Sequence, residues 1–146
     1  MERNLFTIGY EGYSINDFLY WLIKHNIKYV LDVRELPLSR KKGFSKKVFA
    51  QHLSQEKIHY YHMKELGTPK DLREKLKRDQ DYTYFFRAVN RHLEENTIHL
   101  KTVQHLVEEN KCCLMCFEHE ADKCHRSLIA QKIVESSDKG LQIVNI

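Results

Sequence analysis

Five side chains that can take part in a reaction lie close together near the carboxyl end of the chain: Cys116, Glu118, Cys124, His125 and Arg126. Cysteine thiols can act as nucleophiles, and a carboxylate or an imidazole can act as general acid or base. The guanidinium of Arg126 carries a permanent positive charge that suits oxyanions. We therefore predict a reaction on an anionic substrate, with Cys116 or Cys124 as the nucleophile.

The sequence leaves three interpretations of Cys116 and Cys124 open. A metal site would use both cysteines and His125, with Glu118 or His62 as a further ligand. The spacing C-x7-C-H is not a standard zinc spacing, so we name no metal ligand. A transient redox pair is the second interpretation. A reactive thiolate is the third, because Cys124 lies at an expected helix amino terminus, where the pKa of a thiol falls.

The elements that must position these residues follow from the spacing of apolar side chains. Apolar runs typical of strands occur at residues 5–8, 29–31, 58–61, 112–117 and 141–144. Helical spacing recurs over residues 14–26, 46–56, 70–78, 82–94, 98–110 and 124–135. This alternation predicts an α/β fold. We expect a single domain over residues 1–146, a three-layer sandwich with a mostly parallel sheet of about five strands, Rossmann-like or flavodoxin-like.

Polar residues and glycines follow the expected strands. The first strand is followed by Gly9 and Gly12, and the second by Asp32 and Arg34. Cys116 lies near the end of the fourth strand. In a parallel sheet the carboxyl ends of the strands lie along one edge, where ligands bind. Glycines there let backbone amides approach an anion, and Arg34 can hold its charge. Asp32 is a further candidate for general acid or base.

Positive charge is concentrated in two segments of the chain. Residues 34–47 carry six basic side chains and one acidic one, and residues 70–78 carry five and two, whereas the whole chain has a net charge of only +4. The remainder is therefore net negative. Arg40 lies in the first segment, in a loop that could close over an anion. We expect an anionic small molecule or a nucleic acid as the partner.

The composition argues against membrane insertion and export. No apolar run approaches the roughly 20 residues that a membrane span requires, and the amino terminus lacks the pattern of a secretory signal. Four cysteines in such a chain are expected to be mostly reduced thiols. We therefore expect a cytoplasmic protein without membrane contacts.

Four motifs together resemble the domain-of-unknown-function 488 family: TIGYEG, DVRELPLSRKKGFS, HYYH-x3-LGTP and CFE-x5-CHRSLIA. They occur in the family's order, and the resemblance extends from Thr7 to about Val134. It implies a cytoplasmic prokaryotic protein with an α/β fold and no established activity. It also implies a polar signature, in which Ser39 is a further anion-binding candidate. The other residues of this signature are Gly9, Asp32, Arg34, Pro37, Arg40, Phe44, Leu66, Gly67, Cys116, Glu118, Cys124, His125 and Arg126.

The leading hypothesis is an enzyme that acts on a phosphate-bearing substrate, such as a nucleotide or a nucleic-acid end; the sequence identifies no cofactor. Arg34, Arg40 and Arg126 would hold the anion. One alternative is a non-catalytic nucleic-acid-binding accessory protein that uses the two basic segments. Another is a metal- or redox-responsive protein that uses the two cysteines and the adjacent histidine.

Overall fold

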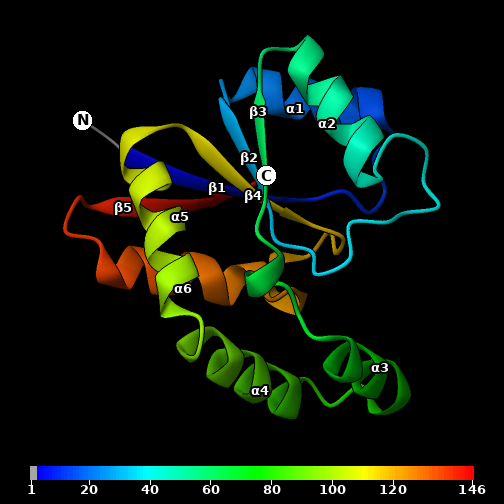
Figure 1. Cartoon of the computed structure of the whole chain (residues 1–146), viewed down its shortest axis with the longest axis vertical. Coiled ribbons are helices and arrows are strands. Elements are labelled where there is room, and N and C mark those ends of the chain that lie inside the picture. The colour runs from blue at the N-terminus through cyan, green and yellow to red at the C-terminus, as the bar shows by residue number, and fades with distance from the viewer. Residues whose placement is uncertain (1–2) are drawn as a thin grey trace.

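The computed structural model describes residues 3–146, and its five strands form one sheet in which every neighbouring pair is parallel. The strand order is β3-β2-β4-β1-β5 (Figure 1). The strands are β1 (Arg3–Gly9), β2 (Tyr29–Asp32), β3 (His59–His62), β4 (Cys112–Cys116) and β5 (Leu141–Asn145). The expectation of a mostly parallel five-stranded sheet is therefore confirmed.

Helices cover both faces of the sheet, which confirms the three-layer α/β arrangement. The helices α1 and α2 pack on one face, and α4, α5 and α6 pack on the other, where α3 joins their outer edge (Figure 1). Their bounds are α1 (Ile15–Lys24), α2 (Lys46–Gln55), α3 (Lys70–Asp79), α4 (Tyr82–Glu94), α5 (Thr97–Glu109) and α6 (Arg126–Ser136), with short 3-10 turns η1 (Lys64–Leu66) and η2 (Ala121–Lys123).

The central strand β4 shows why the chain folds into layers. All five of its residues are buried. Cys112 and Leu114 pack against the α4–α6 side, and Cys113 and Met115 pack against the α1–α2 side. A strand that is covered on both faces appears in the sequence as a continuous apolar run, and β4 does so here. Cys112 and Cys113 accordingly serve as small buried hydrophobic residues.

The strand order creates a crevice at the carboxyl end of β4. The strand lies between β2 and β1, whose following helices, α2 and α1, cover one face of the sheet. The helix that follows β4, α6, covers the opposite face. The connection after β4 therefore runs to one face of the sheet, and the connections after β1 and β2 run to the other face. Open α/β sheets bind ligands at such a point. No helix within residues 3–146 is long and apolar enough to cross a membrane.

Candidate functional site

A cavity of about 390 Å³ lies at this crevice. Four of the predicted site residues line it: Arg34, Cys116, Glu118 and His125. Apolar side chains from the loop after β2 and from the segment after β4 complete its rim, among them Leu36, Leu38 and Phe117. All three are exposed, so the mouth of this site cavity presents apolar surface around a polar interior.

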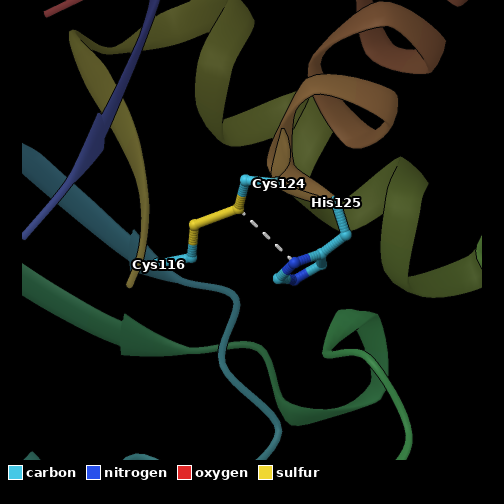
Figure 2. A group of neighbouring side chains, drawn as sticks. All are labelled: Cys116, Cys124 and His125. Atoms are coloured by element: carbon cyan, nitrogen blue, oxygen red, sulfur yellow. Dashed lines mark hydrogen bonds between the residues drawn. A yellow bond between two sulfur atoms is a disulfide. The ribbon is translucent and has the colours of Figure 1, made fainter. Parts of the chain in front are cut away.

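A disulfide joins Cys116 and Cys124 (Figure 2). Cys116 ends β4, and Cys124 lies between η2 and α6, so the packing of α6 against the sheet brings the two sulfur atoms together. Both side chains are buried. Cys116 lines the site cavity, whereas Cys124 lies behind it. The cysteines therefore have different positions: one sulfur borders the cavity, and the other backs it.

Arg126 occupies a different position from the one predicted for an anion-binding residue. It is fully buried in the first turn of α6 and does not line the site cavity. Its Nη1 atom donates a hydrogen bond to the carbonyl of Glu118 and lies 3.2 Å from Sγ of Cys116, and its Nη2 donates to the carbonyl of His119 at 3.1 Å. The guanidinium thus holds the loop after β4 in place. Burial lowers the pKa of Arg126.

His125 presents one ring nitrogen to the sulfur pair. Its Nε2 atom lies 2.7 Å from the carbonyl oxygen of Val33. A carbonyl oxygen only accepts, so Nε2 carries the hydrogen and Nδ1 keeps a lone pair. That lone pair faces Sγ of Cys124 at 3.7 Å (Figure 2). Burial lowers the pKa of His125 to about 4, which leaves the ring neutral at pH 7.

Glu118 supplies a carboxyl group to the same wall of the cavity. Its Oε2 atom lies 3.6 Å from Sγ of Cys116. Burial raises the pKa of Glu118, and the charge of Arg126 only partly offsets this effect. A carboxyl group with a raised pKa can hold a proton and donate it to a leaving group. The carboxyl group of Glu118 therefore borders the cavity next to the sulfur of Cys116.

Asp32 and Arg34 form a buried ion pair. Arg34 donates from Nε to Oδ1 at 2.9 Å and from Nη2 to Oδ2 at 2.7 Å, and Tyr60 donates its hydroxyl hydrogen to Oδ2 at 2.6 Å. Burial lowers the pKa of Arg34, but the hydrogen bonds and charge of Asp32 outweigh this effect and raise it. Asp32 is fully buried and does not line the cavity. Its carboxylate holds Arg34 in place, and its position gives no support to the predicted role as acid or base.

Two backbone amides of the glycine loop after β1, which was predicted to bind an anion, are already bonded within the protein. The amides of Tyr10 and Glu11 donate to the carbonyls of Cys116 and Phe117. The backbone of Gly9 packs against Glu118, because a Cβ there would lie 1.6 Å from the Glu118 carbonyl oxygen. Neither this glycine nor Gly12, which has a φ of +86°, lines the cavity.

Two residues of the long loop are also placed away from the site cavity. Ser39 is bonded within the loop: its backbone amide donates to the hydroxyl of Ser45, and its own hydroxyl accepts from the amide of Lys41. Arg40 is exposed and does not line the cavity. The predicted anion-binding roles of Ser39 and Arg40 therefore find no support in their positions.

The cavity also has polar lining residues that were not predicted as site residues. Arg73 and Lys77, on one face of α3, line the cavity together with Thr68. Arg73 donates to Glu35 at 2.8 Å and to the Thr68 carbonyl at 2.6 Å, which ties α3 to the loop after β2. The Thr68 hydroxyl is buried and has no hydrogen-bond partner among residues 3–146. The signal in the sequence that could have indicated Arg73 and Lys77 was the basic composition of residues 70–78.

One group of side chains in residues 3–146 has the composition of a metal site. The two sulfur atoms of Cys116 and Cys124 and one ring nitrogen of His125 lie within 4.8 Å of one another, and all three residues are buried. Thiolate sulfur and imidazole nitrogen are the ligands that zinc prefers.

A family model described as "Domain of unknown function DUF488" matches residues 14–133 of the chain. The matched region contains every residue that lines the site cavity except Tyr10. Neither the curated proteins nor the solved structures contain a match to the chain.

Proposed function

The chain belongs to the family of the domain of unknown function DUF488, and we propose that it is an enzyme that binds an anionic, phosphate-bearing substrate in the site cavity and acts on it through Cys116. One observation carries this proposal. Sγ of Cys116 borders the cavity and lies 3.2 Å from the buried guanidinium of Arg126, which has no carboxylate partner among the described residues.

The charge of Arg126 favours an anionic sulfur. A buried cation without an anionic partner is destabilising. When the disulfide is reduced, a Cys116 thiolate supplies the missing negative charge and accepts the Nη1 hydrogen. The thiolate is the nucleophilic form of cysteine. The sulfur that faces the cavity is thus the one that the buried cation activates.

The remaining cavity residues favour a negatively charged substrate. Arg34 keeps one unused hydrogen on each terminal nitrogen, since each donates one bond to the protein. Arg73 and Lys77 add two cations from α3. Asp32 pairs with Arg34, and Glu35 pairs with Arg73. Lys77 has no carboxylate partner among the described residues, so it leaves an unpaired positive charge at the wall.

The chemistry that suits this geometry is a nucleophilic displacement. The Cys116 thiolate attacks the electrophilic atom of the bound anion, and the bond to the leaving group breaks. Protonated Glu118 donates its proton to the leaving group. Water then cleaves the covalent intermediate, returns the thiolate and reprotonates Glu118. Arg34, Arg73 and Lys77 hold the substrate, and Arg126 holds the thiolate.

Protection from alkylation tests this proposal. The reduced, metal-free protein is treated with iodoacetamide, with and without inorganic phosphate or a nucleoside monophosphate, and each cysteine is followed by mass spectrometry. We expect Cys116 to react first and the anion to slow its reaction. Calorimetry with Cys116→Ser should still show anion binding. An absence of anion binding at low salt, or a Cys116 that reacts no faster than in the unfolded chain, would contradict the proposal.

A second candidate function is a nucleic-acid-binding accessory role. It is favoured by one observation: both basic segments, residues 34–47 and 70–78, contribute side chains to the same cavity. This role predicts a steep salt dependence of DNA or RNA binding. Replacing Lys42, Lys46 and Lys47 should then weaken binding, whereas Cys116→Ala should leave it unchanged. Binding of nucleic acid that is unchanged in the lysine variants and insensitive to salt would contradict this role.

A further inference from the structure

We infer that the reduced chain binds a thiophilic divalent metal ion, of which zinc is the representative, through Cys116, Cys124 and His125. The three ligand atoms lie within 4.8 Å of one another and are buried together (Figure 2). They come from the end of β4 and from the segment that leads into α6, so the packed fold positions them before an ion arrives. This inference does not rest on the proposed enzymatic role, and an ion bound to Cys116 would block that sulfur as a nucleophile.

His125 has the hydrogen bonding of a metal ligand. A ligating histidine commonly donates its other ring N–H to a backbone carbonyl or carboxylate, which fixes the ring. Nε2 of His125 makes this bond to Val33, and Nδ1 is left free. The distance from Nδ1 to Sγ of Cys124 is 3.7 Å. Tetrahedral zinc with ordinary bond lengths separates sulfur from nitrogen by about 3.6 Å.

Each sulfur atom also has an N–H donor that can stabilise a thiolate. Nη1 of Arg126 lies 3.2 Å from Sγ of Cys116, and the backbone amide of Arg126 donates to Sγ of Cys124 at 3.5 Å. Two thiolates neutralise the double charge of the ion. The buried site therefore carries no uncompensated charge from the ion itself.

An ion held by these three ligands would border the site cavity. Cys116 and His125 both line the cavity, and Cys124 closes the site from behind. Three protein ligands with an open fourth position are typical of catalytic zinc sites. The carboxyl group of Glu118, with Oε2 3.6 Å from Sγ of Cys116, also lines the cavity. The geometry therefore leaves room for water or an anion on the ion.

The disulfide and the metal ion exclude each other. Reduction of the disulfide by a phosphine and water yields two thiols and the phosphine oxide. Binding of a divalent ion then releases two protons and forms two metal–sulfur bonds. Hydrogen peroxide with two protons would reverse this state: the sulfur atoms join again, the peroxide is reduced to two water molecules, and the ion leaves. Metal uptake should thus follow the redox state of the pair.

Titration of the reduced protein with zinc or cobalt ions under argon tests the site. We expect one ion per chain, a thiolate-to-cobalt charge-transfer absorption band, and protection of Cys116 and Cys124 from alkylation by zinc. The oxidised chain should bind no ion at this site. Failure of the reduced chain to take up one equivalent of either ion would overturn the inference.

Matched variants separate this site from the proposed enzymatic role. His125→Asn should weaken zinc binding at least roughly tenfold, whereas His119→Asn, at an exposed neighbouring histidine, should have no effect. In chelator, His125→Asn should keep the rapid alkylation of Cys116, because Arg126 remains in place. Cys124→Ser provides a second ligand variant if His125→Asn does not fold. Unchanged zinc affinity in either folded variant would contradict the assignment of that ligand.

Discussion

The guanidinium of Arg126 lies 3.2 Å from Sγ of Cys116, and no carboxylate of residues 3–146 lies within 4.0 Å of it. A buried arginine usually pairs with an acid. Here the nearest group that can become negative is a cysteine. The pairing links the first turn of α6 to the end of β4, so the chemical state of the sulfur and the packing of the helix depend on each other.

This pairing predicts the effect of Arg126→Met. In reduced, metal-free protein at pH 7, alkylation of Cys116 should slow by roughly tenfold, because the thiolate loses the cation that stabilises it. Arg126→Lys retains the charge and should keep most of the rate. The rates are measured by iodoacetamide labelling and mass spectrometry. Equal rates in wild type and Arg126→Met, with both proteins folded by circular dichroism, would contradict the role of Arg126.

A second prediction concerns the cationic wall of the cavity. Lys77 lines the cavity and is exposed, so Lys77→Ala should weaken phosphate binding by about two- to fivefold, the effect of one exposed charge. Lys75 is the matched control on the same helix, because it pairs with Asp79 and lies over the ring of Tyr84. Calorimetry at low salt measures both. A larger loss in Lys75→Ala would place the anion elsewhere.

Gly9→Ala tests the close approach of β1 to the loop after β4. The added Cβ would lie 1.6 Å from the backbone carbonyl oxygen of Glu118 and 3.0 Å from Nη1 of Arg126. The backbone must shift, so we expect a loss of more than about 3 kcal/mol in the free energy of unfolding. Gly12→Ala meets no atom within 4 Å and should lose about 1 kcal/mol from its positive φ alone. Urea unfolding measures both, and equal losses would argue against the contact.

The buried pair of Asp32 and Arg34 predicts a loss of stability. Asp32→Ala leaves a buried guanidinium without its carboxylate and should lower the free energy of unfolding by about 3–5 kcal/mol. Tyr60→Phe removes only one hydrogen bond to the same carboxylate and should lower it by about 1–2 kcal/mol. Chemical denaturation gives both values. A smaller loss in Asp32→Ala than in Tyr60→Phe would show that the ion pair does not stabilise the fold.

The sequence contained most of the sheet, because buried parallel strands such as β4 appear as unbroken apolar runs. The strand order could not be predicted from the sequence, because the periodicity of apolar residues describes one element and not its neighbours in the sheet. The parallel arrangement was enough to bring Arg34, Cys116 and Glu118 together. The burial of Arg126 away from the cavity could not be predicted, because the pattern does not tell which side chain of the first helical turn faces the sheet. Arg73 was missed because the path of α3 over the end of β2 is a tertiary feature.

The pH dependence of stability should report the buried thiol of Cys112. Burial raises the pKa of Cys112 from its ordinary value of 9.0 to about 12 in the folded chain. Below pH 9 the thiol is protonated in the folded and in the unfolded chain, so its contribution to the free energy of unfolding is fully present and does not change with pH. As the pH rises from about 9 to about 12, only the unfolded chain loses the proton, so the free energy of unfolding falls by up to about 1.4 kcal/mol per pH unit. Cys112→Ala removes this contribution, whereas Cys113 and Tyr60 titrate in both proteins. Urea unfolding of both chains between pH 8 and 11 should therefore give a shallower slope for Cys112→Ala, and parallel curves would show that the thiol is not buried as described.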